Sequence, residues 1–285
     1  MTHRPTQTRA ARDATALAED LPDPIVLQRP HDGLPFEELA RRYNFRKTSS
    51  HGTLITRLIV DECRKRSHPV RVLDIGCGRG IGRKPELSFV VRRFADELWG
   101  VEPDGSVEPP QGLLDHHEVA AIEEADLPAD YFDVAYSCMV MEHVSDPERF
   151  MDAVRRCLKP GGVYLFPTPN KRHYFARIAS ILRALHLDEF VLRLIMGRKV
   201  EDYHYPVRYR FNDEPRIDGC AGRLGFRPPE YLYIESEPPI GYQPRPLRPL
   251  FHLLTLKRML IKNPKSLLTL VCRITRPPEA ARAPA

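Results

Sequence analysis

Glycines at alternate positions mark the stretch of the chain whose residue types point most directly to chemistry. They stand at 76, 78, 80 and 82 in VLDIGCGRGIG, directly after an apolar run that ends in Asp74. A residue without Cβ can take a positive φ and lets a ligand lie against main-chain N–H groups. The spacing excludes two nucleotide motifs, because Ile81 stands where G-x-G-x-x-G needs its last glycine and no G-x-x-x-x-G-K-[ST] sequence is present.

An acidic residue, Glu102, is the second feature that indicates a nucleoside site. It ends the next apolar run, LWGVE, 26 residues after Gly76, close to the spacing at which an acid accepts hydrogen bonds from ribose hydroxyls. In the alternative interpretation the glycines only form a tight strand-to-helix turn and Glu102 caps the turn EPDG. The combination favours a site for an adenosine-containing ligand.

The elements that must position these residues alternate between strands and helices. We expect strands at 70–75, 98–102, 116–121, 131–137 and 163–168, and helices at 34–43, 49–66, 87–96 and 146–158. The last helix has Asp146 as N-cap and Pro147 at its first position. Alternation of this kind predicts an α/β fold with a doubly wound parallel sheet, whose ligand lies at the carboxyl ends of the strands.

Four segments in order carry a family resemblance: VLDIGCGRG, WGVEPD, LPADYFDVAYSCMVMEHVSDP and LKPGGVYLFPTPN. Over about residues 70–170 the chain resembles the class I S-adenosylmethionine-dependent methyltransferases. The resemblance implies a Rossmann-like seven-stranded sheet of order 3-2-1-4-5-7-6 with the last strand antiparallel. It also implies S-adenosylmethionine as the cofactor.

The resemblance further implies roles for particular residues. The cofactor's methionine and ribose are expected against the glycine loop, the ribose on Glu102, and the adenine near an acid after the third strand, for which Glu123 is our choice. The implied cofactor-binding residues are Asp74, Gly76, Cys77, Gly78, Gly80, Glu102, Glu123 and Ser137. The chain departs from the family pattern at IEEAD, which lacks the usual Gly-Asp pair, and at Pro85, which predicts a late start for the next helix.

His143, in MEHV after the fourth strand, is the candidate general base. Histidine titrates near neutrality, and a neutral hydroxyl acceptor is a poor nucleophile without a base. A structural histidine that bonds to backbone is the alternative. The segment is similar to that of ubiquinone-pathway O-methyltransferases, in which a Glu-Glu-His set is associated with a divalent metal. Only Glu142 and His143 match, and Val140 replaces the other Glu, so we expect no metal.

The acceptor class is narrowed by missing motifs. The [N/D/S]-P-P-[Y/F/W] box of nucleobase amino methyltransferases reads SCMV here, and the core has no Pro-Cys pair. TPNKRHYF and YHYPVRYR resemble methyltransferases that modify surface polysaccharides and lipids. We therefore expect a hydroxyl or carboxyl of a small-molecule, lipid or glycan-linked acceptor, with substrate residues Asn170, His173, Tyr205 and Tyr209. An RNA methyltransferase and a catalytically silent adaptor of the same fold remain alternatives.

The sequence divides into regions of different composition. Residues 1–34 are expected to be irregular, 35–236 to form the methyltransferase domain with an inserted helical lid at 171–211, and 237–285 to form a basic, Pro-rich and then helical extension. Eight Arg or Lys and no acid lie between 240 and 278, whereas the whole chain has a net charge of +5. Anionic lipid headgroups attract such a segment. A solvated last helix packed on the core is the alternative.

Cysteine usage and hydropathy indicate the compartment. The six cysteines are scattered without a C-x-x-C pair, which indicates neither a disulfide framework nor a zinc site. No apolar run approaches the length of a membrane span, and the first residues lack the apolar core of a signal peptide. We predict a cytoplasmic protein, with peripheral contact to the inner membrane face as an open question; the oligomeric state is not indicated.

Overall fold

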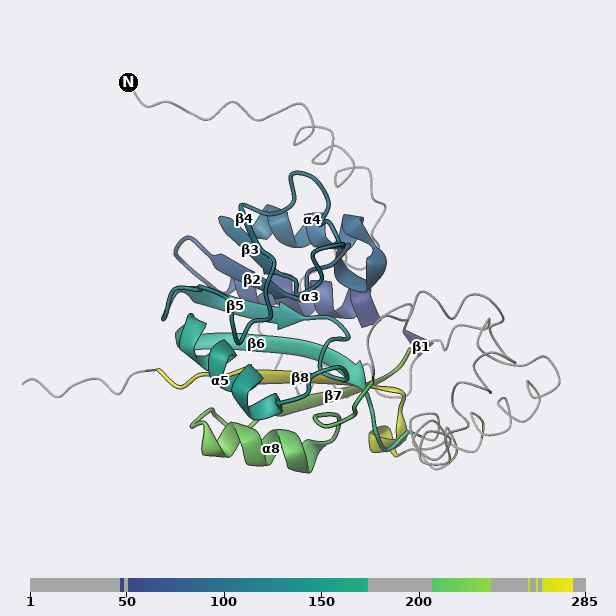
Figure 1. Ribbon diagram of the computed structural model, residues 1–285. Coiled ribbons are helices and arrows are strands. Elements are labelled where there is room, and N and C mark those ends of the chain that lie inside the picture. Colours follow the sequence, from purple (N-terminus) through teal and green to yellow (C-terminus); the bar gives the residue numbers. More distant parts are fainter. Residues whose placement is uncertain are drawn as a thin grey trace, which may run out of the picture.

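The computed structural model describes residues 47–48, 51–173, 207–236, 256, 260 and 263–278. Its centre is an eight-stranded sheet of order β1-β7-β8-β6-β5-β2-β3-β4 (Figure 1). The strands are β1 (Lys47–Thr48), β2 (Arg71–Ile75), β3 (Glu97–Val101), β4 (His116–Glu118), β5 (Phe132–Ser137), β6 (Leu158–Pro169), β7 (Glu230–Ser236) and β8 (Thr269–Thr275). Every neighbouring pair is parallel except the two pairs that β8 makes with β6 and β7.

Helices cover both faces of this sheet. The described ones are α3 (His51–Arg64), α4 (Pro85–Phe94), α5 (Pro147–Cys157) and α8 (Glu214–Arg223), with short 3-10 turns η1 (Ile81–Arg83) and η5 (Pro264–Ser266). In Figure 1, α3 and α4 lie behind the sheet and α5 and α8 in front of it. The buried side chains accordingly form two clusters, one under each pair of helices.

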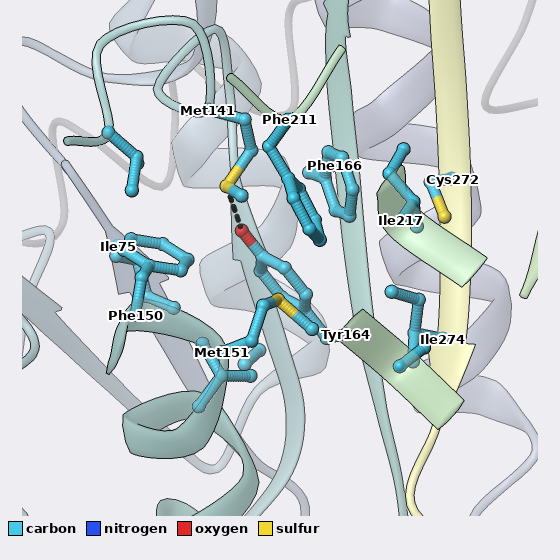
Figure 2. Close-up of a cluster of buried hydrophobic side chains, with 14 of the residues drawn as sticks. Ile75, Met141, Phe150, Met151, Tyr164, Phe166, Phe211, Ile217, Cys272 and Ile274 are labelled. Atoms are coloured by element: carbon cyan, nitrogen blue, oxygen red, sulfur yellow. Dashed lines mark hydrogen bonds between the residues drawn. The ribbon is translucent and has the colours of Figure 1, made fainter. Parts of the chain in front are cut away.

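The apolar run of β2 shows how the sequence builds two layers. Val72 belongs to the cluster under α3 and α4, whereas Leu73 and Ile75 belong to the cluster under α5 and α8. Alternate side chains of a strand point to opposite faces, so a strand covered on both sides must be apolar throughout. Figure 2 shows the cluster under α5 and α8, to which Phe150, Phe166 and Ile217 contribute from three different elements.

The expected strand order is confirmed. Numbered from β2 to β8, the seven strands of this part follow 3-2-1-4-5-7-6, with the seventh antiparallel, and the two-residue β1 adds an eighth strand at the edge. The described part confirms the helix N-cap at Asp146, whose carboxylate accepts from the N–H groups of Glu148 and Arg149. α4 begins at Pro85, in agreement with a late helix start.

The structure corrects the expectation of a helix at the end of the C-terminal extension. Thr269–Thr275 is strand β8, inserted between β6 and β7. Leu270, Val271 and Cys272 are fully buried, and burial on both faces favours a strand for a run rich in branched side chains. The domain therefore includes residues that the sequence analysis assigned to the extension.

One further expected element, β6, differs in its bounds, and other expected elements cannot be compared with the structure. β6 begins at Leu158, earlier than the expected residue 163, because Leu158 already pairs with Phe132 of β5; a register shift then separates this pair from the next one, Val163 with Val134. The expected helix at 34–43 and most of the predicted lid lie outside the described residues. Across the part of the chain that the structure describes, no helix has both the length and the apolarity needed to cross a membrane.

Candidate active site

The glycine loop leaves β2 at the carboxyl edge of the sheet and turns back over it. Gly76 has φ +70° and donates its N–H to the carbonyl of Val101 at 2.8 Å. A Cβ on Gly76 would lie 2.6 Å from Cγ2 of Val140, which is closer than carbon atoms approach. The position therefore requires glycine for its conformation and for the side chain that covers it.

Glu102 follows β3 and faces this loop. Its Oε2 accepts the N–H of Gly78 at 3.0 Å, and its Oε1 accepts the N–H of Asp104 at 3.2 Å. The residue is 7% exposed. Burial raises the pKa of the carboxyl, an effect that the two N–H donors oppose. Each oxygen keeps lone-pair capacity beyond its one backbone bond, so the carboxylate can accept from a pair of ribose hydroxyls.

Asp74 lies beneath the loop at the end of β2. It is 2% exposed, and the hydroxyl of Tyr136 on β5 donates to its Oδ2 at 2.7 Å. Burial raises the pKa of Asp74 to about 7, although the Tyr136 bond lowers it. The surroundings therefore favour the protonated form of this carboxyl, which lies two residues before Gly76 of the glycine loop.

The other predicted loop residues have mostly structural contacts in the described part. Cys77 is buried, its N–H donates to Val101, and burial raises the pKa of its thiol. Gly80, at φ +95°, closes the turn by donating its N–H to the carbonyl of Cys77 at 2.9 Å. Both lie in the loop as expected, and their contacts to a cofactor stay predictions.

Ser137 and Glu123 differ in how much of each side chain is accessible. The Ser137 hydroxyl is fully buried and lies 2.7 Å from the hydroxyl of Tyr164, which also points to the sulfur of Met141 (Figure 2). Because Tyr164 has one hydrogen and donates it to Met141, Ser137 donates to Tyr164, and the cofactor contact of Ser137 stays a prediction. Glu123 lies in a turn after β4, partly exposed, and its adenine contact stays a prediction.

The loop between β5 and α5 carries His143 beside the glycine loop. Its residue Val140 covers Gly76, and the N–H of His143 donates to the Val140 carbonyl at 2.9 Å. The N–H of Met139 donates to Pro167 of β6, which ties the loop to the sheet edge. His143 is partly exposed. The structure thus places the candidate base on the loop that contacts the predicted cofactor site.

A buried polar chain next to His143 is a feature that the sequence analysis missed. The hydroxyl of Thr168 donates to Oε2 of Glu142 at 3.2 Å, and the side-chain amide of Asn212 donates to Thr168 at 2.5 Å. All three residues are at most 5% exposed. Burial raises the pKa of Glu142 to about 7, while its own N–H and Thr168 lower it. No local pattern predicts this chain, because its members lie 26 and 44 residues apart.

The predicted substrate residues are only partly brought together. Asn170 is 1% exposed and uses its amide to donate to the carbonyls of Lys265 and Leu267 at 2.8 Å each, so it fastens the end of β6 to the segment before β8. The N–H of His173 donates to Asn170. Tyr209 donates its N–H to Glu142 at 3.2 Å, next to His143. Tyr205 lies outside the described residues.

Comparison with known proteins agrees with this geometry. A family model described as a methyltransferase domain matches residues 14–216. A ubiquinone biosynthesis O-methyltransferase of Paraburkholderia phymatum is 32% identical over 187 residues, covering 63% of this chain and 77% of that protein. One of Acinetobacter baylyi is 32% identical over 146 residues, covering 48% of this chain and 57% of that protein. The chain thus spans little more than half the length of some of the curated relatives it matches.

A solved structure supports the fold alone. A chain from the complex that holds the Haloferax volcanii Trm112 methyltransferase activator superposes with a TM-score of 0.50 at 12% identity, covering 85% of this chain and 93% of that chain. The sheet order is that of a class I methyltransferase, and the chain belongs to the S-adenosylmethionine-dependent methyltransferase family. S-adenosylmethionine is the cofactor, and the glycine loop with the half-satisfied Glu102 carboxylate fits its nucleoside.

Proposed function

We propose that the protein methylates an oxygen, a hydroxyl or a carboxyl, of a small-molecule, lipid or glycan-linked acceptor. The observation that carries the proposal is the position of His143 on the loop whose Val140 side chain covers Gly76. A base at that place can accept the proton of an acceptor hydroxyl. The names of the curated relatives, ubiquinone biosynthesis O-methyltransferases, support an oxygen acceptor.

In methyl transfer the main task of the protein is to orient the cofactor and the acceptor. S-adenosylmethionine, when bound, supplies a methyl group on a sulfonium centre. Glu102 and the loop N–H groups would fix the nucleoside, and the β5–α5 loop would exclude water from the reacting atoms. Holding the acceptor oxygen in line at about 3 to 3.5 Å supplies most of the acceleration in such a transfer. His143 would take the proton from the attacking hydroxyl.

Three cations of the basic segment are paired with acids of the domain, which weakens the case for a nucleic acid bound at those three positions. Lys265 pairs with Glu214, Arg273 with Glu62 and Glu230, and Arg276 with Asp130. Polyanion binding depends on cations that are free to meet phosphates. We infer that these three residues serve the fold, and that an RNA methyltransferase is the weaker alternative.

We also propose that the protein is cytoplasmic and reaches the inner membrane face peripherally. Leu256 and Leu260 are 53% and 73% exposed, and the sequence between and beside them holds Lys257, Arg258 and Lys262. Exposed leucines beside cations are typical of segments that bind anionic lipid surfaces. Co-sedimentation with phosphatidylglycerol vesicles tests this; equal sedimentation of wild type and a Leu256→Ser/Leu260→Ser variant would contradict it.

The test of the function is methyl transfer into fractionated cell extract. Purified protein is incubated with methyl-labelled S-adenosylmethionine and with lipid, glycan, small-molecule or RNA fractions. We expect label in one of the first three fractions, with no label for the Glu102→Ala variant. Label in RNA that falls steeply with salt would favour the nucleic-acid alternative. Cofactor binding without label in any fraction would favour a catalytically silent adaptor.

A further inference from the structure

Two cations near the candidate base lack a side-chain partner in the described structure. We propose that the acceptor carries an anionic group, a phosphate or a carboxylate, and that Arg208 and Lys171 bind it. The proposal rests on the proposed function, since it names the chemistry of the acceptor at the same site. It is supported by the backbone hydrogen bonds that position Arg208 and Lys171 and by the side-chain partners of the cations near them.

The backbone holds both cations at the carboxyl edge of the sheet. The N–H of Arg208 donates to the carbonyl of Glu142 at 2.6 Å, one residue before His143. Lys171 follows β6 directly, and its N–H donates to the carbonyl of Asn212 at 3.0 Å. Arg208 is thus bonded directly to the loop that carries the candidate base. Lys171 is connected to the same loop through Asn212, Thr168 and Glu142.

The buried polar chain makes this placement rigid. The amide of Asn212 donates to Thr168 and to the carbonyl of Pro169. Thr168 has a single hydrogen, so it accepts from Asn212 and donates to Glu142. Glu142 and Asn212, the two ends of this chain, are the residues whose backbone carbonyls hold Arg208 and Lys171. Because buried polar networks with satisfied bonds have one preferred arrangement, the two backbone positions are defined before any acceptor binds.

Neighbouring cations have partners, which sets Arg208 and Lys171 apart. Arg172 and Lys265 both pair with Glu214, and Arg216 pairs with Asp213 while it donates to the carbonyls of Tyr209 and Arg210. Arg210 donates to the carbonyl of Ser145.

By contrast, the part of the chain that the structure describes offers no hydrogen bond or ion pair to the guanidinium of Arg208 or the ammonium of Lys171. Arg208 is exposed and Lys171 is partly buried. Arginine and lysine side chains form charge-assisted bonds with carboxylate or phosphate oxygens. An acceptor with such a group would be held at its charged end while the neighbouring hydroxyl faces His143.

A binding experiment tests the two residues without turnover. The probes are inorganic phosphate and acetate, compared with chloride at equal ionic strength, with protein Tm as readout. We expect a rise in Tm with phosphate or acetate for the wild type, and none for the Arg208→Gln/Lys171→Gln double variant. The matched control is Arg227→Gln, which removes an exposed cation beyond α8 and should keep the wild-type response. An equal response of wild type and double variant overturns the proposal.

Turnover then distinguishes this proposal from the proposed function. With the extract fraction that accepts label, the double variant should need at least tenfold more acceptor for half-maximal rate, with cofactor affinity unchanged within twofold. The labelled product should bind an anion exchanger. Phosphatase treatment should abolish this binding if the anionic group is a phosphate and leave it unchanged if the group is a carboxylate. Solvent extraction then shows whether the group belongs to a lipid or to a free small molecule. A labelled but neutral product refutes the anionic acceptor alone. A failure to bind cofactor refutes the proposed function.

Discussion

The hydroxyl of Tyr136 on β5 donates to the carboxylate of Asp74 on β2 at 2.7 Å, beneath the glycine loop. Both side chains are buried, so the bond has no competing water. Replacement of Tyr136 by Phe should lower the free energy of unfolding by about 1–3 kcal/mol, because a buried carboxyl loses its donor. Urea denaturation measures this. Tyr131→Phe, which removes a partly exposed bond to Glu97, is the control and should cost less; an equal loss would contradict the assignment.

The raised pKa values of Asp74 and Glu142, each about 7, predict the pH dependence of stability. The folded state holds these two protons up to higher pH than the unfolded chain, which releases them near pH 4. The contribution of both groups to the free energy of unfolding therefore falls as pH rises from about 4 to about 7 and then levels off. Denaturation curves across this range, compared with an Asp74→Asn/Glu142→Gln variant, should show a flatter profile for the variant. Parallel profiles would rule out the shifts.

Arg273 on β8 joins two other elements through Glu62 of α3 and Glu230 of β7. Its replacement by Met should lower the free energy of unfolding by about 2–4 kcal/mol, because the buried Glu62 carboxylate loses a partner. Thermal or urea unfolding measures the change. The control is Arg223→Met, which breaks an exposed pair with Glu148 and should have no measurable effect. A negligible effect of Arg273→Met would mean that β8 is not anchored through this cluster.

His143→Gln tests the candidate base. Methyl transfer to a hydroxyl acceptor should fall by about 10²–10⁴-fold, the usual contribution of a general base, while cofactor binding stays unchanged. The rate of the variant should also lose the rise with pH that deprotonation of a histidine produces in the wild type. If His143 is structural instead, the variant will lose stability and cofactor affinity along with rate.

The elements near the glycine loop were predictable because their signals are local. A buried apolar run followed by glycines, the next run ending in Glu102, and the Asp146-Pro147 helix start each fit within a few residues. β8 was not predictable in this way: its sequence pairs with β6, about 100 residues earlier, and only that pairing decides between strand and helix.

The residues of the candidate site differ in the same way: some have local signals in the sequence and others are joined only by long-range contacts. The glycine loop and Glu102 come from consecutive strands, so their spacing in the sequence carries the information. The buried polar chain of Glu142, Thr168 and Asn212 joins three separate segments by single hydrogen bonds. The sequence around each residue contains no pattern that indicates these bonds. Asn170 is a predicted substrate residue, but the structure shows its amide bonded to two backbone carbonyls, a long-range contact that no local pattern indicates.

The central prediction is that a methyl-bearing nucleoside binds between the glycine loop and Glu102. Calorimetric titration of the folded protein with S-adenosylhomocysteine tests this most directly, with Glu102→Gln as the matched variant. We predict saturable heat for the wild type and about 10-fold or more weaker binding for the variant, since hydrogen bonds to a charged acceptor are worth about 1.5–3 kcal/mol. No heat with the folded wild type, or equal affinity for both proteins, would contradict the account.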